Sequence, residues 1–302
     1  MHFAAQVTLR FADISTPEAI ATATLGAEGI VVTLQPLRRE AIEALDGGVK
    51  VIGRAGVGLD TIDLVAAESA GLAVVNEPAY GTVEVASHAV ALLLSIQRKL
   101  TLADRYVRDG WRGRLVLGEV KPVDELTVGL VGCGRIGVAV AEMLRGMVGA
   151  VLAFDPVGPQ LPEHVERVST LEELLQRSDA VSLHVPLSPE TAGLLSRERF
   201  ALMQRGAVLV NTARGGLIDE AALAEVLQNG QLGGAALDVF VAEPLPPDSP
   251  LLHTPNTVLT PHVAAYSDRS AWRLASWTIE DTVSWIASKD VRNGSVAVRG
   301  TR

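Results

Sequence analysis

The chain has 302 residues, of which 48% are hydrophobic and 20% charged, and its formal net charge is −9. This composition is that of a globular protein and excludes disorder over most of the chain. The acidic charge and the few aromatic residues (4 Trp, 3 Tyr and 5 Phe) argue against a general nucleic-acid binder. At roughly 150 residues per domain, the length predicts two domains. The longest apolar run, at 89–94, is too short to span a membrane.

Cys133 is the single cysteine, which excludes an intrachain disulfide and a zinc site built from several cysteines. No His, Asp and Glu pattern with metal-ligand spacing stands out, so we expect no metal. The N-terminus lacks the basic start and apolar run of a secretory signal. We therefore expect a cytoplasmic protein that acts on a small molecule, with no nucleic-acid or membrane partner.

Short apolar segments rich in β-branched residues alternate with helical patterns. Segments of this kind are typical of strands that helices cover on both faces, in a doubly wound parallel sheet. The predicted strands are 29–33, 49–52, 73–75, 127–131, 150–154, 180–185, 207–211, 234–239 and 257–259. The predicted helices include 171–177 and 220–228, and two longer ones at 82–109 and 267–288. Residues 105–125 are irregular and predict either an excursion of the chain or an arm that contacts a partner.

A glycine-rich turn follows the predicted strand 127–131 and has the pattern G-x-G-x-x-G, with Gly132, Gly134 and Gly137 at the fixed positions. The first glycine permits a tight turn, the second lets the backbone approach a pyrophosphate, and the third allows close contact between helix and strand. The N-terminus of the following helix then presents N–H groups to the anion. The turn predicts a dinucleotide-binding fold.

Asp155 ends the next predicted strand, at the place where such folds carry an acidic residue. A carboxylate there accepts hydrogen bonds from the ribose hydroxyls and repels a 2′-phosphate, which favours NAD over NADP. Pro156 follows, and no arginine comes close behind it in the sequence. The alternative is an ordinary surface aspartate. For Cys133, a small side chain filling the turn is a simpler interpretation than a reactive thiol at a helix N-terminus.

Arg214, Glu243 and His262 each follow the end of a predicted strand. The carboxyl ends of parallel strands are where doubly wound sheets bind ligands. Arginine binds a carboxylate through its planar fork, histidine transfers a proton near neutral pH, and a glutamate orients that histidine. Together they predict reduction of a 2-oxo acid by hydride transfer. Taken singly, each is more often a surface charge or a structural histidine.

Six segments in this order resemble the D-isomer-specific 2-hydroxyacid dehydrogenases, the group that includes D-3-phosphoglycerate dehydrogenase. The resemblance runs from about residue 49 to about residue 286. The segments are 53–63, the glycine-rich turn, 182–187, 211–216, 235–244 and 260–262.

The resemblance implies that His262 donates and accepts the proton, that Glu243 is its partner and that Arg214 orients the substrate. Arg54, Val57 and Gly58 are similar to the family's binding site for the substrate carboxylate. The residues that it implies for NAD binding are Gly132, Gly134, Arg135, Ile136, Gly137, Asp155, Pro156, His184, Pro186, Thr191, Thr212, Ala213, Asp238, His262 and Ala264.

The resemblance also implies two α/β lobes with doubly wound parallel sheets. A Rossmann NAD-binding domain at 99–268 is inserted in a discontinuous, flavodoxin-like substrate domain made of 1–98 and 269–302. Relatives pair as homodimers through the helix from Thr82 and the arm after it, and catalysis takes place in a cleft between the lobes.

Segments 110–126 and 261–267 are most similar to the C-terminal-binding-protein branch, in which a Trp usually stands where this chain has Ala265. Family members usually begin with a further strand and helix before the strand that reads Gln6-Val7-Thr8-Leu9 here. We therefore expect this chain to be short by about one such unit.

The leading hypothesis is an NAD-dependent D-2-hydroxyacid dehydrogenase. The alternative is an NAD(H)-sensing binding protein of the corepressor kind with little turnover. A third hypothesis, oxidation of another small acid such as formate, is disfavoured because relatives acting on formate replace the acidic partner Glu243 with an amide.

Overall fold

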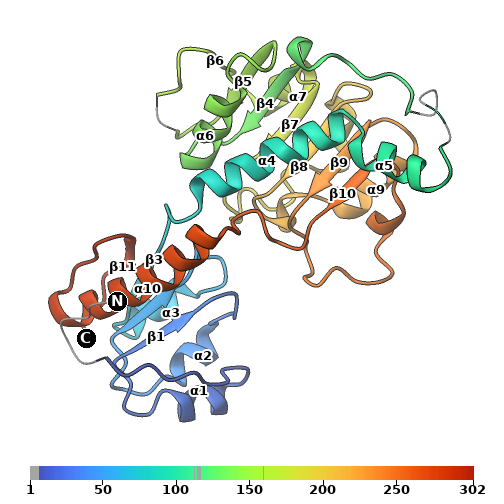
Figure 1. Ribbon diagram of the computed structural model, residues 1–302. Helices are drawn as coiled ribbons and strands as arrows, with labels where there is room; N and C mark the ends of the chain where they lie inside the picture. The colour runs from blue at the N-terminus through green and yellow to red at the C-terminus, as the bar shows by residue number, and fades with distance from the viewer. Residues whose placement is uncertain (1–6, 112, 114–116, 159) are drawn as a thin grey trace. The chain divides into compact units, whose positions relative to one another are not determined.

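The computed structural model describes residues 7–111, 113, 117–158 and 160–302. The chain forms two compact units (Figure 1). Unit 1 combines Met1–Gly81 with Ser267–Arg302, and unit 2 is Thr82–Tyr266. Both units are α/β, as the alternation of strands and helices predicts.

Unit 2 contains a seven-stranded parallel sheet with the order β10-β9-β8-β7-β4-β5-β6. This is the Rossmann arrangement, in which consecutive strands run outward in both directions from β4. The strands are β4 (Thr127–Val131), β5 (Ala150–Phe154), β6 (Val165–Arg167), β7 (Ala180–Leu183), β8 (Val208–Asn211), β9 (Gly234–Leu237) and β10 (Thr257–Leu259). All but β6 match predicted strands to within two residues at each end.

Helices cover both faces of this sheet. Successive strand residues point to opposite faces, so each face presents side chains that can pack against helices. Val128 and Leu130 pack in one apolar cluster with α4 (Thr82–Gln97) and α6 (Arg135–Leu144). Val181 and Leu209 pack in a second cluster with α7 (Leu171–Arg177), α8 (Arg197–Leu202) and α9 (Glu220–Gln228). The strands are therefore apolar on both faces, which is why their sequences lack an alternating pattern.

The boundary between the units differs from the predicted domain boundary in the placement of the first long helix. The sequence places residues up to 98 in the substrate domain, whereas α4 belongs to unit 2. Ala86, Ala89 and Leu93 of α4 are buried in the cluster formed with α6 and the sheet, and Figure 1 shows α4 lying along that sheet. The helical pattern predicts that this face is buried, but not against which sheet.

Unit 1 contains a four-stranded sheet with the order β1-β2-β3-β11. Its strands are β1 (Gly29–Val32), β2 (Val51–Arg54), β3 (Ala73–Asn76) and β11 (Ser295–Val298). The sequence predicts parallel strands only, and this is wrong for β11, which pairs with β3 in the antiparallel direction. The chain returns from α10 (Asp268–Ser288) through a short loop, without the crossover that a parallel strand requires.

The long helix α10 covers one face of the unit 1 sheet. A side chain at Gly29 or Gly53 would overlap Thr282 of α10, so these glycines allow the helix to lie close to β1 and β2. Ile20, Ile42 and Ala66 pack on the opposite face. They belong to α1 (Pro17–Ala23), α2 (Arg39–Glu43) and α3 (Leu64–Ser69).

The strand that the sequence predicts before α1 is not formed over Val7–Leu9, and Gln6 lies outside the described residues. β1 is the outermost strand of the unit 1 sheet. A strand requires a hydrogen-bonded neighbour, and residues 7–9 pair with none of the described strands.

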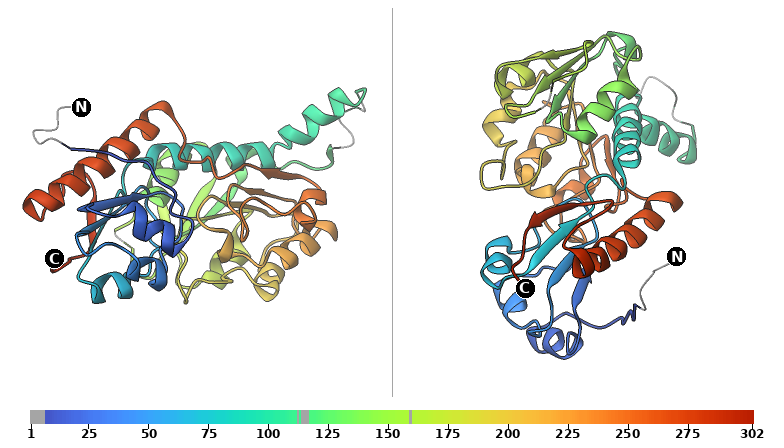
Figure 2. Two further views of the ribbon diagram at one scale, coloured as in Figure 1. Left: turned by 90° about the horizontal axis from the view of Figure 1, so that it is seen from below. Right: turned by 90° about the vertical axis from the view of Figure 1, so that its left-hand side faces the viewer.

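The predicted helix 82–109 is two helices, α4 and α5 (Leu100–Arg108), because Lys99 between them has a left-handed φ of 53°. Figure 2 shows α5 projecting from the body of unit 2. Of the irregular arm after it, residues 112 and 114–116 lie outside the described part of the chain.

In the other predicted long helix, Ser267 caps α10 through a capping box. Among the described residues, no helix is long and apolar enough to cross a membrane.

Candidate active site

The predicted site residues of unit 2 lie in loops that follow the carboxyl ends of its parallel strands. These ends form one edge of the sheet, and the strand order changes direction between β4 and β7. A side chain on Gly132 would lie 2.7 Å from Val185 Cγ1 and 2.8 Å from the His184 carbonyl oxygen. The loops after β4 and β7 therefore touch at the switch point, where such sheets bind their ligands.

The glycine-rich turn has the geometry of a pyrophosphate site. Gly132 adopts a φ of 92°, which favours glycine, and a side chain on Gly137 would overlap the Gly132 carbonyl oxygen. Gly134 is the N-cap of α6, makes no side-chain cap, and would place a side chain in open space. The N–H groups at Arg135 and Ile136 thus begin α6 beside a space that an anion can fill. The turn fits a dinucleotide.

Asp155 follows β5 and is hydrogen-bonded to this turn. Its Oδ2 accepts from the backbone N–H of Cys133 at 2.7 Å, and its Oδ1 accepts from that of Val157 at 3.1 Å. The carboxylate therefore lies directly beside the glycine-rich turn. Burial, and then the nearby Asp155, raises the pKa of the Cys133 thiol to about 11. This favours the simpler interpretation of Cys133 as a small side chain that fills the turn.

Arg167 is a residue that the sequence does not bring to this site. It ends β6, and because β6 pairs with β5, its guanidinium donates a hydrogen bond to the Asp155 carbonyl oxygen. No arginine follows Asp155 closely in the sequence, but the fold brings Arg167 next to it. The contact forms because β6, a three-residue strand that the sequence does not predict, pairs with β5.

The loop after β7 contains His184, Pro186 and Thr191. His184 Nε2 lies 2.9 Å from Ser182 Oγ, and desolvation lowers the pKa of this histidine to about 4. The ring is therefore neutral near pH 7. Thr191 Oγ1 donates to the Pro186 carbonyl oxygen at 2.7 Å and accepts from the Ser188 N–H at 2.8 Å. These contacts fix the conformation of the loop.

Arg214 follows β8 in a loop that Asn211 organises. The Asn211 amide donates to the Arg214 carbonyl oxygen at 2.8 Å, and its Oδ1 accepts from the Ala213 N–H at 3.0 Å. A side chain on the next residue, Gly215, would overlap the Phe240 backbone. The glycine thus lets the loop with Arg214 approach the loop after β9. Thr212 is buried at the start of this turn.

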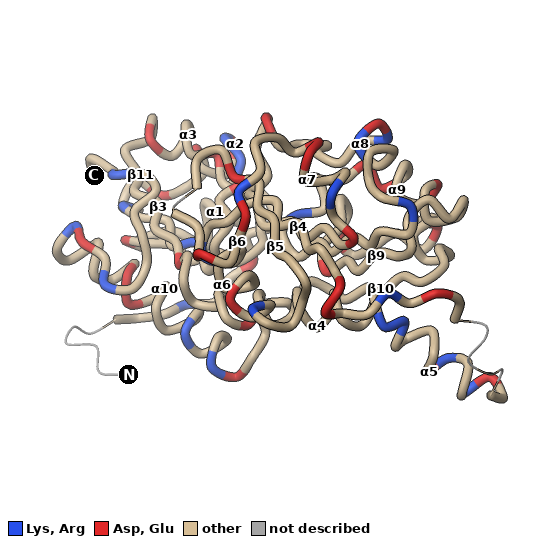
Figure 3. Tube along the Cα trace, turned by 90° about the horizontal axis from the view of Figure 1, so that it is seen from above, with Lys and Arg blue, Asp and Glu red and all other residues tan. Residues whose placement is uncertain are grey.

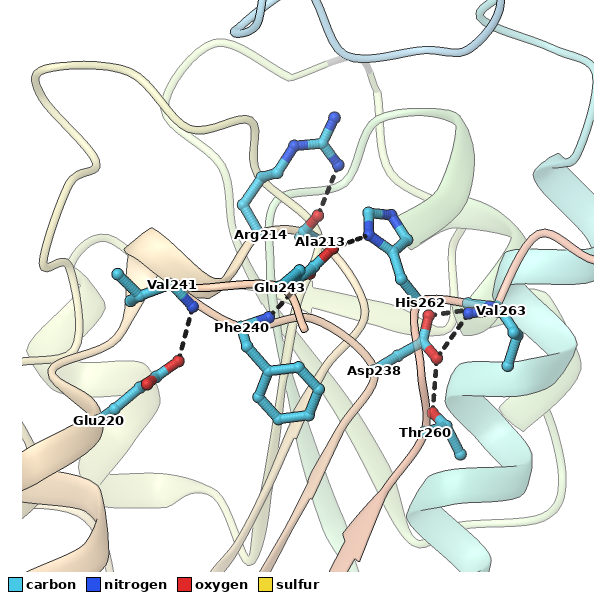
Figure 4. A network of polar contacts seen from close by, with 11 residues as sticks. Ala213, Arg214, Glu220, Asp238, Phe240, Val241, Glu243, Thr260, His262 and Val263 are labelled. Carbon is cyan, nitrogen blue, oxygen red and sulfur yellow. Dashed lines mark hydrogen bonds and ion pairs between the residues drawn. The ribbon is translucent and has the colours of Figure 1, made fainter. Parts of the chain in front are cut away.

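Glu243 and His262 come together from two different loops. His262 Nδ1 lies 2.7 Å from Glu243 Oε2, and the two side chains are 32% and 33% exposed. Glu243 Oε1 also accepts from the Phe240 N–H at 3.0 Å, which fixes the carboxylate. Figure 4 shows the His262 ring and the Arg214 side chain extending to the same side of this edge. Glu243 and His262 are thus in direct contact, and Arg214 lies on the neighbouring loop, which approaches the loop after β9 at Gly215.

Asp238 lies beneath His262 and is fully buried. Its carboxylate accepts from Thr260 Oγ1 at 2.5 Å, the Val263 N–H at 3.0 Å and the Ala264 N–H at 2.8 Å (Figure 4). The turn that carries His262 is therefore bound to the end of β9.

A histidine on an apolar helix gives no signal in the sequence, so reasoning from the sequence missed His88. This residue of α4 contacts Thr260, which is hydrogen-bonded to Asp238.

Arg54, Val57 and Gly58 lie in unit 1, at the end of β2 and in the loop after it. Arg54 is 4% exposed, and its guanidinium donates to the Ala55 carbonyl oxygen. Gly56 has a φ of 146°, and a side chain there would overlap that guanidinium. Asn76 donates to the Val57 carbonyl oxygen at 2.8 Å, which ties the loop to β3.

Ion pairs link the helices on the outer face of unit 2, where α8 carries charges of both signs and the charged residues of α9 are acidic (Figure 3). Arg197 of α8 pairs with Glu225 of α9, and Arg199 of α8 lies 3.2 Å from Glu172 of α7. Within the described ranges, no group of three or more His, Cys, Asp or Glu is placed to hold a metal ion.

Residues 90–264 match the family model of the D-isomer specific 2-hydroxyacid dehydrogenase, NAD binding domain. The chain belongs to this family. Unit 2 is accordingly its NAD-binding domain, and the predicted family, Rossmann fold and NAD cofactor are confirmed.

Named relatives can be aligned with most of this chain. It is 41% identical over 271 residues to a D-3-phosphoglycerate dehydrogenase of Archaeoglobus fulgidus, with 88% of this chain and 51% of the relative covered. It is 40% identical over 258 residues to a glyoxylate reductase of Korarchaeum cryptofilum, with 83% and 76% covered. The chain thus spans about half the length of the phosphoglycerate dehydrogenases that it matches.

A solved structure of a protein from Thermus thermophilus is similar over nearly the whole fold. Its TM-score is 0.83 and its sequence identity 39%, with 91% of this chain and 88% of that chain covered. Both units therefore have counterparts in a known structure.

Proposed function

We propose that this protein is an NAD-dependent dehydrogenase that interconverts a 2-oxo acid and a D-2-hydroxy acid. The observation that carries the proposal is the 2.7 Å contact between His262 and Glu243, beside Arg214, on the sheet edge that holds the glycine-rich turn. The names of the relatives, D-3-phosphoglycerate dehydrogenase and glyoxylate reductase, support the same chemistry.

We propose a role for each reacting side chain that is consistent with this geometry. Glu243 is hydrogen-bonded to Nδ1 of His262, so Nε2 is the nitrogen that gives the proton to the carbonyl oxygen of the substrate. The Glu243 carboxylate stabilises the imidazolium that must form in each cycle. Arg214 orients the substrate through charge-assisted hydrogen bonds. The bound dinucleotide supplies the hydride for reduction and accepts it in the reverse direction.

Cofactor binding divides among the loops on the same edge. We propose that Gly132 to Gly137 hold the pyrophosphate, that Asp155 and Pro156 lie at the adenosine ribose, and that His184, Pro186 and Thr191 lie at the adenine and phosphate side. Thr212, Ala213, Asp238 and Ala264 would hold the nicotinamide end. In unit 1, Arg54 with the backbone of Val57 and Gly58 would bind the substrate carboxylate.

Purified protein with NADH and a panel of 2-oxo acids tests the proposal. We expect oxidation of NADH with at least one of glyoxylate, hydroxypyruvate and phosphohydroxypyruvate, followed as loss of absorbance, and a strong preference for NADH over NADPH. NADH binding without turnover on the whole panel would instead support the cofactor-sensing hypothesis, as the predicted likeness to the C-terminal-binding-protein branch suggests.

We further propose that the protein is a homodimer that pairs through α5 and the arm after it. No residue of α5 is buried, and Leu100, Val107 and Trp111 are 56%, 53% and 76% exposed. Val107→Glu should shift the mass measured by light scattering from dimer to monomer. Val65→Glu, at another helix position that is 66% exposed, is the matched control and should leave the mass unchanged.

A further inference from the structure

His88 on α4 reaches the loop that carries the catalytic histidine. Its Nε2 lies 3.2 Å from Thr260 Oγ1 and 3.6 Å from Asp238 Oδ1, and its side chain is 25% exposed. The helix and the loop are far apart in the sequence but both belong to unit 2. The roles proposed above for the loop residues do not involve His88.

The direction of these hydrogen bonds follows from the donors present. Asp238 is fully buried, and its carboxylate is the acceptor for Thr260 Oγ1 at 2.5 Å. A hydroxyl has one hydrogen, which Thr260 gives to this carboxylate. The Thr260 oxygen must therefore accept from His88, so His88 carries its proton on Nε2. A chain of hydrogen bonds runs from His88 through Thr260 to Asp238.

Asp238 in turn fixes the backbone on both sides of His262. Its carbonyl oxygen accepts from the His262 N–H at 2.8 Å, and its carboxylate accepts from the N–H groups of Val263 and Ala264. His262 itself has a φ of 53°, a left-handed conformation that is uncommon in residues other than glycine and that the surrounding hydrogen bonds hold in place. The strained turn therefore depends on how the Asp238 carboxylate is held.

We propose that His88 is a positioning residue for His262, acting through Thr260 and Asp238 to hold the strained turn that presents the imidazole to Glu243. This inference rests on the proposed function, because it assigns His88 to the same reaction. His88 lies behind the loop and transfers no proton to the substrate. Its loss would leave the reacting groups present but misplaced, and misplacement of about 1 Å costs about 100-fold in rate.

Two substitutions of His88 separate positioning from simple packing. His88→Leu removes the Nε2 donor and should lower kcat about 10- to 100-fold, with the Kd for NADH and the melting temperature little changed. His88→Gln keeps an N–H donor near the same place and should restore most of the lost rate. Ser87→Ala is the matched control: its hydroxyl bonds to the Glu84 carbonyl oxygen on the same helix, and kcat should be unaffected. Equal loss in the Leu and Gln variants would overturn the proposal.

A double substitution tests whether the effect passes through His262. If His88 acts through that ring, His88→Leu should cause no further loss in a His262→Asn background, whereas an independent role would give a full additional loss. The ¹⁵N chemical shifts of the His262 imidazole, measured in the full-length protein without substrate, give a readout that needs no turnover. They should move in His88→Leu and return in His88→Gln. Unchanged shifts would refute the positioning role even if the protein proved not to be a dehydrogenase.

Discussion

The two halves of the seven-stranded sheet build their parts of the site in different ways. After β4, the residues from Gly132 to Gly137 are contiguous and act through backbone geometry. After β8, β9 and β10, the side chains of Arg214, Glu243 and His262 come from three separate loops and meet only in the fold. We therefore expect changes in the glycine-rich turn to alter cofactor affinity and changes of these three side chains to alter turnover.

The largest effect is expected from removal of the proton donor. His262→Ala should lower kcat about 10²- to 10⁴-fold, because general acid–base transfer contributes about that much. The Kd for NADH, measured by fluorescence, should stay close to that of the unmodified protein. His253→Ala is the matched control, since His253 is an exposed histidine of the same unit. A large loss of NADH affinity in His262→Ala would contradict the expectation that this side chain affects turnover and not cofactor binding.

Substitutions of the two glycines at the start of α6 test the part of the site that follows β4. A methyl group on Gly134 would lie in open space, so Gly134→Ala should leave the melting temperature unchanged but weaken NADH binding about tenfold, as it occupies ligand space. A methyl group on Gly137 would overlap the Gly132 carbonyl oxygen, so Gly137→Ala should lower the melting temperature. Unchanged NADH affinity in Gly134→Ala would mean that the pyrophosphate does not lie there.

A smaller effect is expected at the ribose end of the first half. Asp155→Ala should reduce the preference for NADH over NADPH by about tenfold, because the carboxylate no longer repels a 2′-phosphate. Arg167 lies beside Asp155 and would then supply a cation to that phosphate. The double variant Asp155→Ala with Arg167→Ala should therefore use NADPH less well than the single variant. Equal kcat/KM for NADPH in the two would exclude Arg167 from this role.

Glu77 offers a comparison outside both halves, because it lies in unit 1 and is fully buried. Burial, and then the nearby Asp281, raises its pKa from 4.5 to about 8. The folded state thus holds a proton that the unfolded state releases between these values, so this contribution to stability is complete below pH 4.5 and is lost as the pH rises through about 8.

Glu77→Gln should accordingly raise the free energy of unfolding near pH 9 by about 1–3 kcal/mol and have less effect near pH 5. Denaturant unfolding at the two pH values measures this. Glu68→Gln, at an exposed position of α3, is the control and should change neither value. A gain that is the same at both pH values would show that burial, and not ionisation, is what the glutamine relieves.

Much of the fold follows from local patterns. β4, β5 and β10 and the helices α7 and α9 begin and end at the predicted residues, since apolar runs and helical spacing are local properties. β6 and β11 are missed because each is three or four residues long and half-exposed, so a neighbouring strand stabilises it rather than its own sequence. The break at Lys99 is missed because the residues on both sides continue one helical pattern.

The sequence by itself determined the family, the glycine-rich turn and the identities of Arg214, Glu243 and His262, because each belongs to a short motif whose residue types are visible without the fold. Only the tertiary structure decided that α4 packs on the Rossmann sheet, that Arg167 lies beside Asp155, and that His88 reaches Thr260. The reason is physical: these contacts join residues distant in the chain, and strand order and helix packing bring them together.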